Sequence, residues 1–125
     1  MLGSAPVVAN VPAVDLQRAR SFYADKLGLK ELGGAPDGVF FEAGQGSKIF
    51  IYQRPEATKA EHTAASFKVD DVLAAVKGLK AKGVKFESYD MGEIKTDADN
   101  IARMGDLHAS WFKDTEGNIL CVANM

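Results

Sequence analysis

The 125-residue chain has a single cysteine, little net charge and no long apolar run. Because Cys121 has no second cysteine to pair with, no disulfide forms within the chain, and a reducing compartment is expected. The formal net charge is -2 and the basic residues are scattered, which disfavours a nucleic-acid partner. No segment is apolar over the length of a bilayer, and residues 1–6 do not resemble a signal sequence. We therefore expect a soluble, cytoplasmic protein with neither a nucleic-acid nor a membrane partner.

A chain of this length buries most of its apolar surface without disulfides or a structural metal, so one domain over residues 1–125 is expected. Within it, a pattern repeats at about half the length. Asp15 is placed as a helix N-cap, and the apolar residues that follow at helical spacing are Leu16, Ala19, Tyr23 and Leu27, with Gly28 at the expected helix end. Asp71 occupies the position of Asp15 in the second copy.

The repeat extends beyond these helices. Phe40–Gly46 is echoed by Trp111–Gly117, and each stretch leads through a turn into a short apolar strand. Each copy reads as a strand, a helix and then more strands, so the chain is expected to form two units that bury their apolar faces against one another. We place module 1 at about 6–54, a linker at about 55–61 and module 2 at about 62–125.

The expected elements follow from composition and alternation. Pro12 is expected to mark the end of a first strand that begins at about Val7, because proline interrupts strand pairing. The other expected strands are Lys30–Ala35, Val39–Glu42, Lys48–Gln53, His62–Val69, Lys85–Tyr89, Leu107–Lys113 and Ile119–Ala123, and the second helix is expected at about Asp71–Lys82. The polar stretch Asp90–Asp106 is expected to be a long loop with a functional or mobile role.

Two stretches resemble a known superfamily: Val14–Gly28, with its Val-Asp-Leu start, and Phe112–Asn118. Together they resemble the vicinal oxygen chelate superfamily, which includes glyoxalase I, the bleomycin-resistance proteins and the extradiol dioxygenases. The resemblance covers nearly the whole chain. It implies an α+β fold of two βαβββ modules, whose mixed sheets curve into a cup with the helices outside, usually in a homodimer.

In metal-dependent members of this superfamily, the ligands lie on the first and last strand of each module. The resemblance, combined with the repeat, assigns those places here to Val8, Phe50, Ala64 and Cys121. Three of these side chains cannot bind a divalent cation, and one thiolate does not replace a set of nitrogen and oxygen ligands. We therefore expect neither a metal nor another cofactor. His62, two residues before the Ala64 position, is a weak alternative ligand.

A pocket lined by aromatic and small side chains is expected instead. Strand alternation puts Phe50 and Tyr52 on one face, and the resemblance brings them together with Val8, Asn10, Ala64 and Ser66. Trp111, His108 and Cys121 complete the expected ligand-binding set. Such a lining suits a flat organic molecule held by stacking and burial. The alternative is that these side chains fill the cup as core.

His108 and Cys121 are the candidate catalytic groups. Histidine titrates near neutrality and suits acid or base catalysis, whereas a satisfied histidine in a half-buried strand is the simpler interpretation. Cys121 is interpretable as a nucleophile or as an ordinary buried small residue.

We thus expect sequestration or sensing of a small organic molecule, in the manner of the bleomycin-resistance branch, rather than catalysis. The alternatives are a glyoxalase-like lyase or dioxygenase with atypical metal ligands, and a metal-free lyase or isomerase that uses His108 or Cys121.

Overall fold

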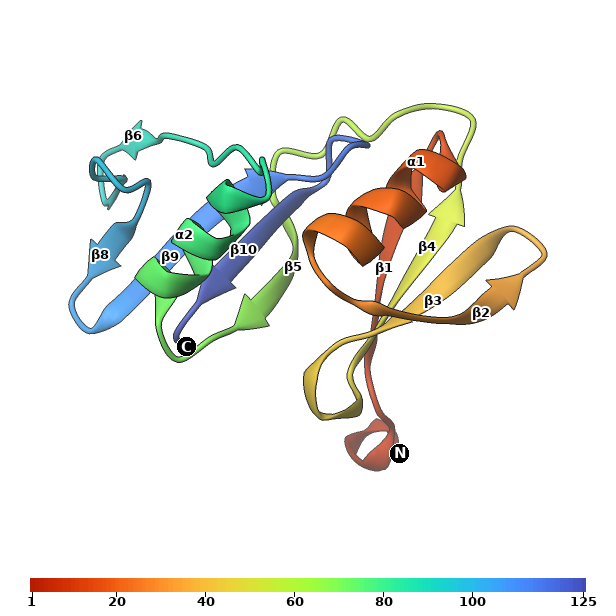
Figure 1. Ribbon diagram of the computed structural model, residues 1–125. Helices are drawn as coiled ribbons and strands as arrows, with labels where there is room; N and C mark the ends of the chain where they lie inside the picture. Colours follow the sequence, from red (N-terminus) through yellow and green to blue (C-terminus); the bar gives the residue numbers. More distant parts are fainter. The chain divides into compact units, whose positions relative to one another are not determined.

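The computed structural model describes residues 1–125, which divide into two compact units. Unit 1 comprises Met1–Lys59 and Thr115–Gly117, and unit 2 comprises Ala60–Asp114 and Asn118–Met125. Each unit has a four-stranded mixed sheet and one α-helix (Figure 1). The expected α+β fold of two βαβββ modules is therefore confirmed.

The sheet of unit 1 has the strand order β1-β4-β3-β2. Its strands are β1 (Val8–Ala13), β2 (Lys30–Ala35), β3 (Gly38–Glu42) and β4 (Lys48–Gln53), with the short 3-10 turns η1 (Leu2–Ser4) and η3 (Gly44–Gly46) beside them. β1 runs parallel to β4, and the other pairs are antiparallel. The prediction that the first strand stops at Pro12 is wrong. β1 continues to Ala13 because it is the edge strand of its sheet, where a proline is tolerated.

The helix of unit 1 begins where the sequence predicted. The Asp15 carboxylate accepts a hydrogen bond from the backbone N–H of Arg18 at 3.0 Å and caps α1 (Leu16–Ser21). The helix widens into the π-helical turn η2 (Phe22–Lys26), after which Gly28 has a φ of 72°. Tyr23 is fully buried, with its ring centroid 6.0 Å from that of Phe41 on β3. This contact holds the helix on one face of the sheet.

The sheet of unit 2 has the strand order β5-β10-β9-β8, with β5 parallel to β10. Its elements are β5 (Thr63–Lys68), α2 (Val72–Ala81), β8 (Ala102–Met104), β9 (Leu107–Lys113) and β10 (Ile119–Ala123), together with a hairpin of β6 (Asp90–Met91) and β7 (Ile94–Lys95). As predicted, Asp71 caps α2, accepting from the N–H of Ala74 at 3.0 Å. None of the helices has the length and apolar character needed to cross a membrane.

Two predictions for unit 2 are wrong. The segment Lys85–Tyr89 is not a regular strand, since its ladder with β9 is reduced to a single bridge between Phe86 and Phe112. The stretch Asp90–Asp106 is not a structureless loop, because it contains β6, β7 and β8. These strands are only two or three residues long, too short for alternation to reveal.

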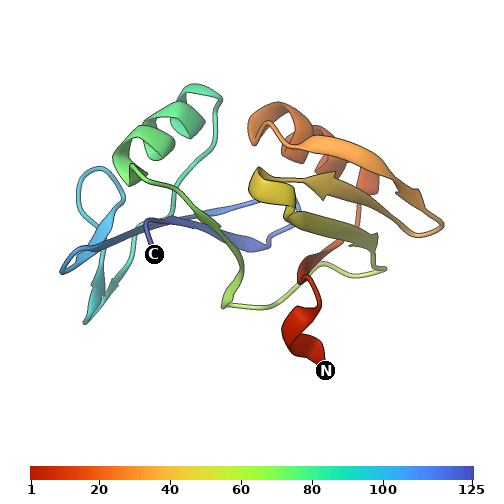
Figure 2. The same cartoon turned by 90° about the horizontal axis from the view of Figure 1, so that it is seen from below.

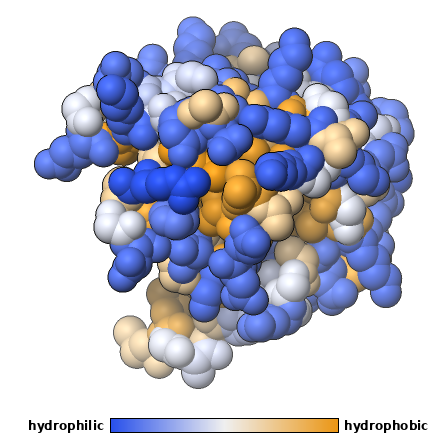
Figure 3. Space-filling model, turned by 60° about the vertical axis from the view of Figure 1, so that its left-hand side comes forward, coloured by the Kyte–Doolittle hydropathy of each residue, from blue (hydrophilic) through white to orange (hydrophobic).

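In unit 2, α2 packs against β9 and β10, and its buried residues are Val72 and Val76. Figure 2 shows α2 on one side of this sheet and the teal hairpin of β6 and β7 on the other. In unit 1 the turn η1 has no buried residue and projects at the lower end of Figures 1 and 3. Since each unit has one α-helix, one face of each sheet is left without a helix.

Candidate functional site

The face of the unit 1 sheet away from α1 carries the four residues expected there. Asn10 pairs with Phe50 in the parallel register of β1 and β4, and Val8 and Tyr52 lie two residues away on the same face. The opposite face carries buried Val11 and its partners under the helix. Phe50 and Tyr52 thus share a face as strand alternation predicted, and Val8 and Asn10 join them as the resemblance implied, while the role of all four in ligand binding stays a prediction.

Three aromatic rings form a row on this face. The ring centroids of Phe40 and Phe50 are 4.5 Å apart, and those of Phe50 and Tyr52 are 6.3 Å apart in a stacked arrangement with 14° between their planes. The row needs a glycine beneath it, because a Cβ atom on Gly38 would lie 2.6 Å from Cζ of Phe50. All three rings are only partly buried, so they present a flat apolar surface.

The corresponding face of unit 2 is built from smaller side chains. Cys121 on β10 pairs with Ser66 on one side and with Trp111 on the other. Ala109, Cys121 and Ala123 are buried together, and Trp111 packs against them. Trp111 is therefore the large ring of this face.

Two of the expected residues have no pairing partner on this face. His108 pairs with Arg103 and shares its side of the sheet with Ser110, whereas Trp111 projects to the opposite side. A bulge in β5 lets Thr63 pair with Ile119 and Ala65 with Leu120, so Ala64 has no partner on β10. The register therefore places His108 on the side of the sheet opposite Cys121, whereas the role of Ala64 stays a prediction.

A cavity of about 520 Å³ opens on the Trp111 side of the unit 2 sheet. Its lining residues are Glu61, His62, Thr63, Glu87, Tyr89, Met91, Ile94, Trp111, Lys113 and Ile119. The walls combine aromatic and aliphatic side chains with a few charged groups, which is the usual composition of a site for a small organic molecule.

Specific contacts hold the aromatic wall of this cavity. The indole Nε1 of Trp111 donates a hydrogen bond to the hydroxyl of Thr63 at 3.2 Å. The Tyr89 ring meets that of Trp111 edge to face, with centroids 5.5 Å apart. Glu87 donates its backbone N–H to the Trp111 carbonyl at 2.7 Å, and its carboxylate lies 3.6 Å from the Lys113 ammonium. Thr63 and Tyr89 thus orient the indole, and Glu87 holds the backbone of Trp111, before any ligand arrives.

Burial determines the protonation of two groups near this wall. It raises the pKa of the Cys121 thiol, and the hydrogen bond to Ser66 offsets this only in part. It also raises the pKa of the Tyr89 hydroxyl, with Glu87 adding to the effect. Both groups are neutral at physiological pH. Since the thiolate is the nucleophilic form, the environment of Cys121 argues against covalent catalysis.

The residues present do not fit the divalent cation of metal-dependent relatives. Val8, Phe50 and Ala64 offer no donor atom in their side chains, and Cys121 offers a buried thiol with a raised pKa. His62 lines the unit 2 cavity, but no group of three or more His, Cys, Asp or Glu side chains is arranged to hold a metal ion.

Most of the cavity wall was not predicted from the sequence. Thr63 was hidden by the bulge, and Met91 and Ile94 by the hairpin that was expected to be a loop. A signal did exist for Tyr89 and Glu87, because residues two apart in the expected strand Lys85–Tyr89 share a face.

The family can be established from sequence. Residues 6–122 match the Glyoxalase/Bleomycin resistance protein/Dioxygenase superfamily. The chain belongs to this superfamily. No curated protein matches its sequence at a significant level.

Solved structures support the same fold. A lactoylglutathione lyase from Agrobacterium tumefaciens is 22% identical, with 98% of this chain and 95% of that one covered and a TM-score of 0.66. The fosfomycin resistance protein FosX from Listeria monocytogenes, complexed with Mn(II) and sulfate ion, is 14% identical, with 100% and 94% covered and a TM-score of 0.67. A glyoxalase/bleomycin resistance protein/dioxygenase from Alicyclobacillus acidocaldarius is 18% identical, with 96% and 90% covered and a TM-score of 0.68. At these identities the similarity shows the fold alone.

Proposed function

We propose that this superfamily member binds a small, planar organic molecule in the unit 2 cavity and releases it unchanged. The observation that carries the proposal is the cavity of about 520 Å³ whose wall holds Trp111 against Tyr89. An oriented indole offers a large apolar surface and loses little conformational freedom when a ligand stacks on it.

The chemistry of the wall favours binding over turnover. The thiol of Cys121 is protonated, and His108 lies on the opposite side of the sheet. The side chains at the positions of the metal ligands do not fit a cation. In unit 1, Val8, Asn10, Phe50 and Tyr52 form the second face that we assign to ligand binding, and in unit 2 Ser66 and Cys121 lie beside Trp111. We further propose that the protein acts as a homodimer, which native mass spectrometry of freshly purified protein tests directly.

Trp111 is the only tryptophan, so its fluorescence reports on this cavity alone. We expect 4-nitrobenzyl alcohol, a neutral planar probe whose nitro group quenches tryptophan on contact, to quench the emission saturably. Tyr89→Leu removes the second ring of the wall and is expected to weaken binding about fivefold. Leu32→Ala, on an exposed residue of β2, is the matched control and leaves the curve unchanged.

A linear, non-saturating quench equal to that of free N-acetyltryptophanamide would contradict the proposal. So would a saturable quench that Tyr89→Leu leaves unaltered in a folded variant. Recovery of the probe as an oxidised or rearranged product would show turnover and would favour an enzyme.

One observation supports a second candidate, a lyase or dioxygenase with atypical metal ligands: His62, Glu61 and Glu87 line the same cavity. This candidate requires that Ni²⁺, Zn²⁺ or Fe²⁺ raise the melting temperature in a way that His62→Ala abolishes. We expect no such shift.

A further inference from the structure

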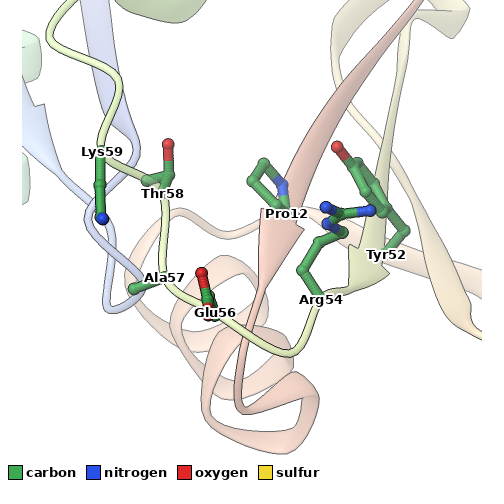
Figure 4. Close-up of a pocket in the computed structure, with 7 residues that line it drawn as sticks. All are labelled: Pro12, Tyr52, Arg54, Glu56, Ala57, Thr58 and Lys59. Carbon is green, nitrogen blue, oxygen red and sulfur yellow. The ribbon is translucent and has the colours of Figure 1, made fainter.

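A second cavity lies within unit 1, at the ends of β1 and β4. Its volume is about 550 Å³, and its lining residues are Pro12, Tyr52, Arg54, Glu56, Ala57, Thr58 and Lys59. Figure 4 draws Pro12, Tyr52 and Arg54 on one side of the cavity, and Ala57, Thr58 and Lys59 of the chain that follows β4 on the other.

One side of this cavity is anchored by the sheet. Pro12 and Tyr52 are register partners in β1 and β4. Arg54 directly follows the strand, and its backbone N–H donates to the Ala13 carbonyl at 2.9 Å. The Tyr52 ring ends the aromatic row, stacked on Phe50 at 14°. A flat surface and the base of a guanidinium side chain are therefore held next to each other by the fold.

The charge of this cavity differs in sign from that of the unit 2 cavity. Two cations, Arg54 and Lys59, and one carboxylate, Glu56, line the cavity, and none of the three is in an ion pair. In unit 2, the two carboxylates Glu61 and Glu87 outnumber the ammonium of Lys113. The unit 1 cavity thus has a net charge of about +1, whereas the whole chain has a net charge of -2.

We propose that the unit 1 cavity is a separate binding site for a planar organic monocarboxylate. The ring of the ligand packs on Tyr52 and Pro12, and its carboxylate accepts hydrogen bonds from the Arg54 guanidinium, whose fork matches a carboxylate. Lys59 adds a second positive charge, and Glu56 disfavours a ligand with two negative charges.

Benzoate is the probe, because it is the smallest molecule with both features, and calorimetric titration of the whole chain measures its binding. Benzamide has the same ring without the charge, and acetate has the charge without the ring. We expect benzoate to bind, and both of these controls to bind about tenfold more weakly.

Arg54→Gln is expected to weaken benzoate binding about tenfold. The matched control, Arg20→Gln, removes one positive charge from the partly exposed pair with Glu31 and leaves binding unchanged. Both side chains are substantially exposed, so both variants are expected to fold, which circular dichroism checks.

Three outcomes would overturn the proposal. They are no heat of binding up to high millimolar benzoate, equal binding of benzoate and acetate, and equal losses in Arg54→Gln and Arg20→Gln. Quenching of Trp111 by benzoate in proportion to binding would also overturn it, because the ligand would then occupy the unit 2 cavity. Because the unit 1 cavity contains no tryptophan, a failure of this proposal can be distinguished from a failure of the proposed function.

Discussion

The two units share their strand topology and their helix caps, and they differ on the sheet faces that no helix covers. In each, the first and last strands pair in parallel and an aspartate caps the helix, at Asp15 in one and Asp71 in the other. On the open faces, the sheet of unit 1 carries a row of three rings, and the sheet of unit 2 carries one indole among small residues. Topology and caps are thus shared, whereas binding chemistry is free to diverge on the open faces.

The strand registers show which residues make this difference between the two open faces. In unit 1, Gly38 lies across from Tyr52, and Phe40 across from Phe50. In unit 2, the corresponding pairs are Ala109 with Ala123, and Trp111 with Cys121. Unit 1 therefore combines a residue without a side chain with three large rings, and unit 2 combines one large ring with three small side chains.

Gly38→Ala tests this difference most severely. The new Cβ would meet Cζ of Phe50 at 2.6 Å and the backbone carbonyl oxygen of Ile51, which cannot move without disturbing the sheet. We expect a loss of about 2–3 kcal/mol in the free energy of unfolding, measured by urea denaturation.

The matched change in unit 2 is Ala109→Gly, which removes a Cβ instead of adding one. It is expected to cost about 0.5–1 kcal/mol, chiefly through backbone entropy. If Gly38→Ala cost no more than Ala109→Gly, the aromatic row would not require glycine, and the contrast between the two faces would fail.

A second difference between the two copies lies at Glu116. Its carboxylate is 1% exposed and accepts from the backbone N–H groups of Val14 and Asp15, both at 3.0 Å, and from the Arg18 guanidinium at 2.8 Å. The corresponding residue of the first copy is Gln45, which is exposed. Glu116→Gln is expected to cost about 2 kcal/mol, because it replaces a buried charged acceptor that several partly buried donors share. Glu31→Gln, in the partly exposed pair with Arg20, is expected to cost less than about 0.5 kcal/mol.

The same residue predicts a pH dependence. Burial alone would raise the pKa of Glu116, but the hydrogen bonds from Arg18, Asp15 and Thr115 lower it from the ordinary 4.5 to about 2. Between these values the unfolded chain binds a proton that the folded chain does not, so the contribution is complete above 4.5 and is lost as the pH falls toward 2. Wild-type stability is expected to fall by up to about 1.4 kcal/mol per pH unit more than that of Glu116→Gln. Parallel curves from urea titrations would contradict this.

The repeat and its helix caps could be predicted from the sequence because they depend on local signals, such as an aspartate before an apolar helical face. The shared face of Phe50 and Tyr52 could also be predicted, since alternation holds along an uninterrupted strand. The prediction failed at Thr63, which a bulge pairs with Ile119, and at Met91, which lies in a strand two residues long. The cavity wall of unit 2 is built from these irregular places, and this is why pattern alone did not reveal it.

The smallest expected effect concerns the feature that the units share. The carboxylates of Asp15 and Asp71 each accept one backbone N–H at 3.0 Å, so alanine at either position is expected to cost about 1 kcal/mol and asparagine much less. Equal losses in urea denaturation, within about 0.5 kcal/mol, would mean that the two caps do the same task in both units. A loss at Asp15 that far exceeds the loss at Asp71 would mean that Asp15 also depends on Glu116, its immediate neighbour, and the caps would then belong with the differences between the units.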